Sequence, residues 1–277
     1  MTEILSFGFM QRAFIAGIAM SLFCGMISVF IILRRVSFLG SGISHAAFGG
    51  VAIGFFLGIN PILSALAYCI IIAFAIEIIS EKGRLAEDTS IGIFFSTSMA
   101  FGILLISLSK TYTVDLFGYL FGSIIAISRE EVYVATGLSL ILIIIFSLIK
   151  KDLLYITFNE ELSIINGIPV RFIKSLFLVS MAIAIVIGIK IVGVILVSAL
   201  LVIPGAIARL LTRRFYAMFI ISSLSAVIST IAGLFVSYIY DLAPGGVIVM
   251  LLASLFSLAF IKTILDRKGH KLFSGSG

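Results

Sequence analysis

The sequence predicts an all-α, polytopic transmembrane helical bundle. Of its 277 residues, 61% are hydrophobic and 12% are charged, and a soluble domain with this composition could not cover its surface with polar groups. Several apolar runs reach the roughly 18 residues that a helix needs to cross a bilayer. The alternation of polar and apolar residues that a transmembrane β-barrel requires does not occur. We expect residues 1–277 to form a single membrane-embedded domain.

Apolar runs bounded by charged or turn-forming residues define the expected spans. They lie at 13–33, 36–59, 61–79, 90–108, 131–149, 172–189, 191–208, 215–240 and 244–263. The chain has nine spans if 191–208 crosses the membrane fully, and eight if this run only enters it. The stretch 116–127 is too short to cross and is expected to form a short or re-entrant helix. Breaks around Gly40 and Lys190 indicate either interrupted helices that line a path or simple flexibility near a helix end.

Basic residues gather at alternate ends of these spans, as at Arg34-Arg35, Lys150-Lys151 and Arg213-Arg214. Because positively charged loops of membrane proteins face the cytoplasm, we expect the N-terminus outside and the C-terminus inside. The formal net charge of +6 is then a topology signal. It does not indicate a nucleic-acid partner, and the surroundings expected for this chain are membrane lipid.

His45 is the one ionisable residue near the middle of an expected span. Ten helical residues after Arg35 place it about 15 Å into a hydrocarbon core about 30 Å thick. Because an intramembrane imidazole is costly, it indicates a functional site, and imidazole binds divalent metals readily. Ser41 and Ser44 are candidate weak ligands beside it. The alternative is a structural histidine that hydrogen-bonds Ser41 or a backbone carbonyl of a neighbouring helix.

One histidine cannot complete a metal site, since zinc takes about four ligands. A two-fold homodimer that brings together two copies of His45 is the expected solution. Small residues also recur at every fourth position of the His45 span, which allows close approach of another helix. We expect this stripe to pack a central helix and to line the pathway. Its members are Gly42, Ala46, Gly50 and Gly54, continued by Gly58, and span one offers a counterpart in Gly17, Ser21 and Gly25.

The longest polar interval lies between Lys151 and Arg171 and predicts a short cytoplasmic helix over 159–168. It contains an N-capping residue, an acidic first turn, an apolar face and a glycine stop. These features come from Asn159, Glu160, Glu161, Leu162, Ile165 and Gly167. Such a helix is suited to docking into a groove on a partner protein, or else to resting on lipid.

The chain is not expected to be an enzyme. It has no Gly-x4-Gly-Lys-Ser/Thr loop, so any ATP-driven role needs a separate ATPase subunit. Ser41 and Ser44 make poor nucleophiles for His45, because a serine one turn away on the same helix has poor attack geometry and no separate nucleophile turn exists. A proton-coupled carrier is a further alternative, with Glu77 as its nearest acidic candidate.

Five short motifs follow one another along the chain, and together they suggest a family. They are Ser44-His45-Ala46, Glu87-Asp88-Thr89-Ser90, Asp115-Leu116-Phe117-Gly118, Lys190-Ile191-Val192-Gly193 and Pro244-Gly245-Gly246. With these motifs the chain resembles, over nearly its whole length, the permease subunits of bacterial and archaeal ABC importers for zinc, manganese and iron (the ABC-3 family). The resemblance implies a homodimer of the type II ABC importer kind, located in the cytoplasmic membrane.

The resemblance also implies two ABC ATPase subunits and an extracytoplasmic metal-binding protein as partners, with 159–168 as the coupling helix. It implies no covalently bound cofactor, a divalent metal as cargo, and ATP only through the partner subunit. Similar proteins often have an aspartate one turn before the histidine, where this chain has Ser41. Loss of that hard ligand favours zinc over manganese or iron. An importer of siderophores or cobalamin is the alternative within the same fold, although a small-residue stripe suits a narrow path.

Overall fold

The computed structural model describes residues 7–108 and 127–273, with side chains described as far as Asp266. Within these ranges the chain is helical and contains no strand. The helices are α2 (Gly8–Arg34), α3 (Ser37–Leu57), α4 (Pro61–Gly83), α5 (Glu87–Leu108), α7 (Arg129–Phe158), α8 (Glu160–Ile165), α9 (Val170–Val192), α10 (Val194–Leu211), α11 (Phe215–Tyr240) and α12 (Pro244–Phe273). The short helix expected at 116–127 lies, apart from Ile127, outside the described residues.

Nine of the described helices are long and apolar enough to cross a membrane. They include α10, with 18 residues and a mean hydropathy of 2.4, so the described part of the chain has nine candidate spans and not eight. The expected and observed bounds agree closely except at the C-terminal ends of α12 and α7. α12 was expected to end at residue 263 and continues to Phe273, and α7 was expected to end at residue 149 and continues to Phe158. No proline or glycine interrupts it there, and Leu153 and Ile156 remain buried in line with Phe146.

The expected helix breaks at Gly40 and Lys190 are both misplaced. Gly40 lies inside α3, where a Cβ would come 3.0 Å from the Leu201 side chain of α10, so its small size serves packing. Lys190 lies in the last turn of α9, and the chain breaks three residues later at Gly193. With φ 85° and ψ 161°, Gly193 has a backbone conformation that other residues adopt only with strain.

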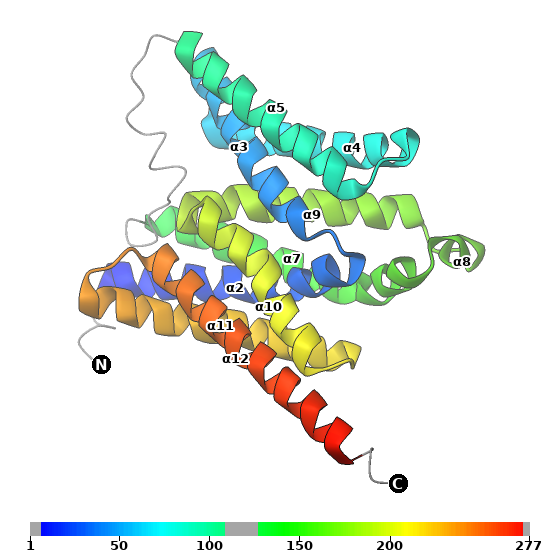
Figure 1. Cartoon of the computed structure of the whole chain (residues 1–277). Coiled ribbons are helices and arrows are strands. Elements are labelled where there is room, and N and C mark those ends of the chain that lie inside the picture. Colours follow the sequence, from blue (N-terminus) through cyan, green and yellow to red (C-terminus); the bar gives the residue numbers. More distant parts are fainter. Residues whose placement is uncertain (1–6, 109–126, 274–277) are drawn as a thin grey trace.

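The spans form two groups of helices that are joined mainly through α9 and α10. Figure 1 shows α3, α4 and α5 together on one side of the molecule and α2, α11 and α12 on the other. α9 contacts α3 and α4 in the first group and α2, α7 and α10 in the second. We call α3, α4 and α5 the His45 sub-bundle, because α3 carries His45.

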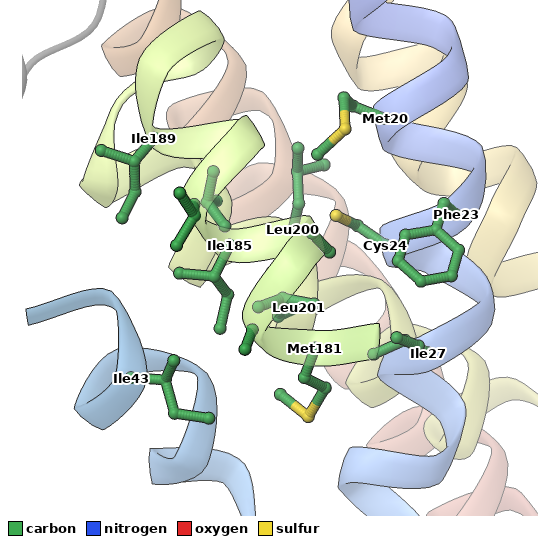
Figure 2. Packing of buried hydrophobic residues seen from close by; sticks show 14 of the residues in the cluster. Met20, Phe23, Cys24, Ile27, Ile43, Met181, Ile185, Ile189, Leu200 and Leu201 are labelled. Carbon is green, nitrogen blue, oxygen red and sulfur yellow. The ribbon is translucent and has the colours of Figure 1, made fainter. Parts of the chain in front are cut away.

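The apolar core runs through the junction between these two groups. Figure 2 shows Met20 and Ile27 of α2, Ile185 of α9, Leu201 of α10 and Ile43 of α3 in one cluster of buried side chains. Helices α2, α3 and α9 are the most enclosed spans, whereas α5 and α12 are among the least enclosed. The apolar outer faces of α5 and α12 are therefore free to meet lipid or another subunit.

Charged contacts mark the two ends of the bundle. At one end, Arg34 at the close of α2 lies 3.7 Å from Glu87 at the start of α5. At the other, Lys190 of α9 pairs with Glu131 of α7 at 2.6 Å, and Arg12 Nε donates to the Ile127 carbonyl at 2.8 Å. Successive spans therefore run in the alternating directions that the basic clusters predict.

Candidate functional site

His45 lies near the middle of α3 and against α5. It is the ninth residue of a 21-residue helix, and its ring meets the Phe95 ring edge-on, with the ring centroids 4.6 Å apart. The side chain is half-buried, and its Nδ1 atom is buried without a hydrogen-bond partner among the described residues. A structural histidine is normally held by such a bond. No described residue supplies that bond to Nδ1, and a ligand-binding role of His45 remains a prediction.

The two serines that were grouped with His45 have different surroundings. Ser41 lies one turn before His45 on the same face of α3, and both side chains are partly exposed. Ser44 is fully buried: its hydroxyl donates to the Gly40 carbonyl at 2.7 Å and accepts from Ser198 of α10 at 3.4 Å. The structure thus brings Ser41 beside His45 and directs Ser44 toward α10. Metal binding by all three remains a prediction.

The glycine stripe of α3 packs within its own sub-bundle. A Cβ on Gly50 would lie 2.6 Å from Ala65 of α4, and one on Gly54 would lie 2.6 Å from Pro61. Gly42 faces Ile91 of α5, while Ala46 is buried. Gly58 does not belong to this packing, because it caps the C-terminus of α3 and meets open space. A role of the stripe in lining the pathway stays a prediction.

The small residues of span one have a different partner from the one expected. Ser21 of α2 lies 2.5 Å from the hydroxyl of Thr230 on α11, and a Cβ on Gly25 would come 2.8 Å from Ser223, also on α11. The expectation that this stripe is the counterpart of the α3 stripe is therefore wrong. Spacing identifies a helix that can be approached closely, but it does not say by which neighbour.

The short helix α8 connects α7 to α9. Its N-cap is Asn159, which accepts from the Leu162 N–H at 2.9 Å, and the chain turns away at Gly167 with φ 77°. Leu162 and Ile165 are 55% and 78% exposed, so the predicted apolar face is not covered by the rest of the chain. Docking of this face onto an ATPase remains a prediction.

A cluster of charges that is not evident from the sequence connects α8 to the spans α9 and α4. Lys174 Nζ of α9 lies 2.7 Å from the carboxylate of Glu160 and 3.2 Å from that of Glu81 on α4. The cluster was missed because the three residues are far apart in sequence and each is unremarkable at the end of its helix. The described residues contain no group of three or more His, Cys, Asp or Glu side chains that could hold a metal.

Comparison with known proteins agrees with this architecture. Residues 6–263 match the model of the ABC 3 transport family. The chain is 39% identical over 258 residues to the manganese transport system membrane protein MntC of Halalkalibacterium halodurans, covering 93% of this chain and 88% of that protein. It is 34% identical to the manganese import system permease protein ScaB of Streptococcus parasanguinis, covering 97% and 95% of the two chains.

A solved structure shares the fold as well. The structure of PsaBC from Streptococcus pneumoniae in complex with a Fab superimposes with a TM-score of 0.82 at 34% identity, covering 94% of each chain. The family model spans eight of the nine candidate spans completely and most of α12. On these grounds the chain belongs to the ABC 3 transport family.

Proposed function

We propose that this chain is the membrane permease subunit of an ATP-driven importer of divalent metal, located in the cytoplasmic membrane of a bacterium or archaeon. The observation that carries the proposal is His45: an imidazole near the centre of an enclosed span, with a buried nitrogen that no described residue engages. The free-energy cost of an imidazole inside the membrane and its affinity for divalent metals together favour a bound ligand at this position. Membership of the ABC 3 transport family supports a role in ATP-driven transport.

Manganese is the proposed cargo, ahead of zinc and iron. The metal named for MntC and ScaB is manganese. The sequence argument for zinc depended on Ser41, which replaces a hard carboxylate ligand with a hydroxyl. A weak pathway ligand need not select the metal, because a delivering protein can make that selection. For the choice of metal, the manganese named for the relatives therefore has more weight than the presence of Ser41.

The proposed assembly is a homodimer with two ATPase subunits and an extracytoplasmic metal-binding protein. One chain supplies a single pathway histidine, and a two-fold axis would supply a second. The exposed apolar face of α8 is the surface offered to the ATPase. ATP-driven closure of the ATPases would move α8, so that the path near His45 opens alternately to each side.

Reconstitution tests the proposal. The purified chain is expected to copurify with an ATPase subunit that carries a Walker motif. In proteoliposomes with this ATPase and the metal-binding protein, we expect ATP-dependent uptake of radioactive manganese that an equal concentration of zinc inhibits weakly. Preferential zinc uptake would assign the cargo to zinc, whereas repeated absence of an ATPase from the complex would overturn the ABC assignment.

A further inference from the structure

Lys174 joins three helices at the end of the bundle where α8 lies. The residue is only 7% exposed, although it belongs to the first two turns of α9. Its two carboxylate partners, Glu160 of α8 and Glu81 of α4, have side chains that are 45% and 61% exposed. We call these three residues the Lys174 cluster. The lysine is thus the enclosed centre, and a carboxylate reaches it from each of two other helices.

The burial of the lysine gives these contacts a stabilising role in the fold. A buried ammonium group without partners is strongly destabilising, while one that is paired and hydrogen-bonded is tolerated. The two glutamates have no such need, because water reaches both. Any movement that pulls Glu160 away from Lys174 therefore costs free energy, so α8 and α9 should move together.

α8 has little else that attaches it to the bundle. It has only six residues, of which Ser163 alone is buried, and the hydroxyl of Ser163 bonds within the same segment, to the Asn159 carbonyl at 2.8 Å. Its main contacts are with α7 and α9, the helices to which it is directly connected. Glu160 is the one α8 residue with an ion pair to the described spans. Apolar burial, which fixes most helices, contributes little here.

The Lys174–Glu81 contact connects the cluster to the helix that packs against the His45 helix. Glu81 belongs to α4, whose opposite half packs tightly against α3: Ser64 donates to the Gly50 carbonyl at 2.7 Å, and Ala65 leaves no space for a side chain at position 50. Because α3 and α4 are in backbone contact, displacement of α4 is transmitted to the helix that carries His45.

We infer that Lys174 is a positioning residue that carries motion of α8 to α4, and through α4 to the His45 helix. When an ATPase displaces α8, the displacement reaches α9 through the peptide chain and the Glu160–Lys174 contact, and α4 through the Lys174–Glu81 contact. This inference rests on the proposed function, in which α8 meets the ATPase. It adds the link inside the permease that converts movement at α8 into movement at the path.

Glu160→Gln and Lys174→Met test the link in the reconstituted complex. The quantity to measure is ATP hydrolysed per manganese ion taken up, together with ATPase copurification. We expect both variants to keep the ATPase bound and to raise this ratio about 5-fold or more, the lower range for coupling between two sites. Asp88→Asn is the matched control, since Asp88 is an exposed carboxylate at the same end of the bundle. It should behave as the parent chain does.

The double variant Lys174→Met with Glu160→Gln separates a direct contact from two independent defects. If the two residues act through one ion pair, the double variant should resemble the Lys174→Met variant, so that the two effects do not add. A parental ratio in Glu160→Gln, or strictly additive effects, overturns the inference. Failure of the parent complex itself to take up metal would instead overturn the proposed function.

Discussion

Ser41 lies one helical turn before His45 on the same face of α3. We expect Ser41→Asp to increase uptake of manganese relative to zinc, because it places a hard carboxylate one helical turn from the imidazole. Competition uptake in the reconstituted complex measures the change. Ser41→Asn has nearly the same shape as Ser41→Asp without its charge and is the control. Equal effects of Asp and Asn would show that charge at this position does not affect the choice of metal.

Ser28 holds α10 where Pro204 interrupts its hydrogen-bond ladder. The Ser28 hydroxyl accepts from the Gly205 N–H at 2.8 Å and donates to the Val202 carbonyl at 3.2 Å, in a buried contact between α2 and α10. Ser28→Ala removes both bonds and is expected to destabilise the protein by about 1–3 kcal/mol. The readout is the thermal unfolding midpoint in detergent, which should fall. Ser254→Ala, which removes an exposed hydroxyl bonded within α12, should leave the midpoint unchanged.

A single residue points to a functional site in the sequence when its side chain has a high free-energy cost at that position. An imidazole inside a span is expensive, so His45 stood out in the sequence, and the structure places it near the centre of α3 with an unpaired nitrogen. Lys174 did not stand out, because a lysine near a helix end is ordinary. Only the fold shows that it is enclosed and that two distant glutamates reach it.

The α3–α4 contact depends on the absence of side chains along α3. Gly50→Ala places a Cβ 2.6 Å from the Cα atom of Ala65, which is too close for a carbon–carbon contact, so one helix must shift. We expect a lower thermal unfolding midpoint and reduced uptake, because α3 also carries His45. Gly137→Ala is the same change in α7 at a position with open space. It should not lower the midpoint, since alanine is the better helix former. A Gly50→Ala protein as stable as the parent would contradict the packing account.

Helix bounds could be predicted well because they depend on local sequence. Apolar length, capping residues and turn-forming residues all lie within the segment that they define. Two departures from the expected bounds have tertiary causes. α3 runs through Gly40, which packs against Leu201, and α7 continues beyond residue 149 with Leu153 and Ile156 buried. The partner of the α2 stripe could not be predicted either, since spacing carries no information about which helix is the neighbour.

The arrangement of charges over the whole molecule predicts its orientation in the membrane. Arg84 and Tyr240 lie at opposite ends of the described bundle, and Tyr240 is 69% exposed. In intact cells a membrane-impermeant maleimide should label Tyr240→Cys and not Arg84→Cys, because basic ends face the cytoplasm. The native Cys24 and Cys69 are buried and give little background. Labelling of Arg84→Cys alone would reverse the assigned orientation.

The two helix groups give the molecule a natural division for alternating access. The His45 sub-bundle meets the remaining helices mainly through α9 and α10, so movement of this unit against the rest would take place at that junction. α9 also carries Lys174 at one end and Lys190 at the other, each in an ion pair with another helix. This division could not be foreseen from the sequence, since it arises from contacts between residues that are remote along the chain.

Manganese uptake by the His45→Ala variant is the most direct test of the central claim that the metal path passes this residue. The variant should assemble with its ATPase and unfold at the parental temperature or above, because the substitution removes a buried nitrogen without a described partner. ATP-driven uptake in proteoliposomes should nevertheless fall to the level seen without ATP. Uptake at the parental rate by a fully assembled variant would contradict the claim and make His45 a structural residue.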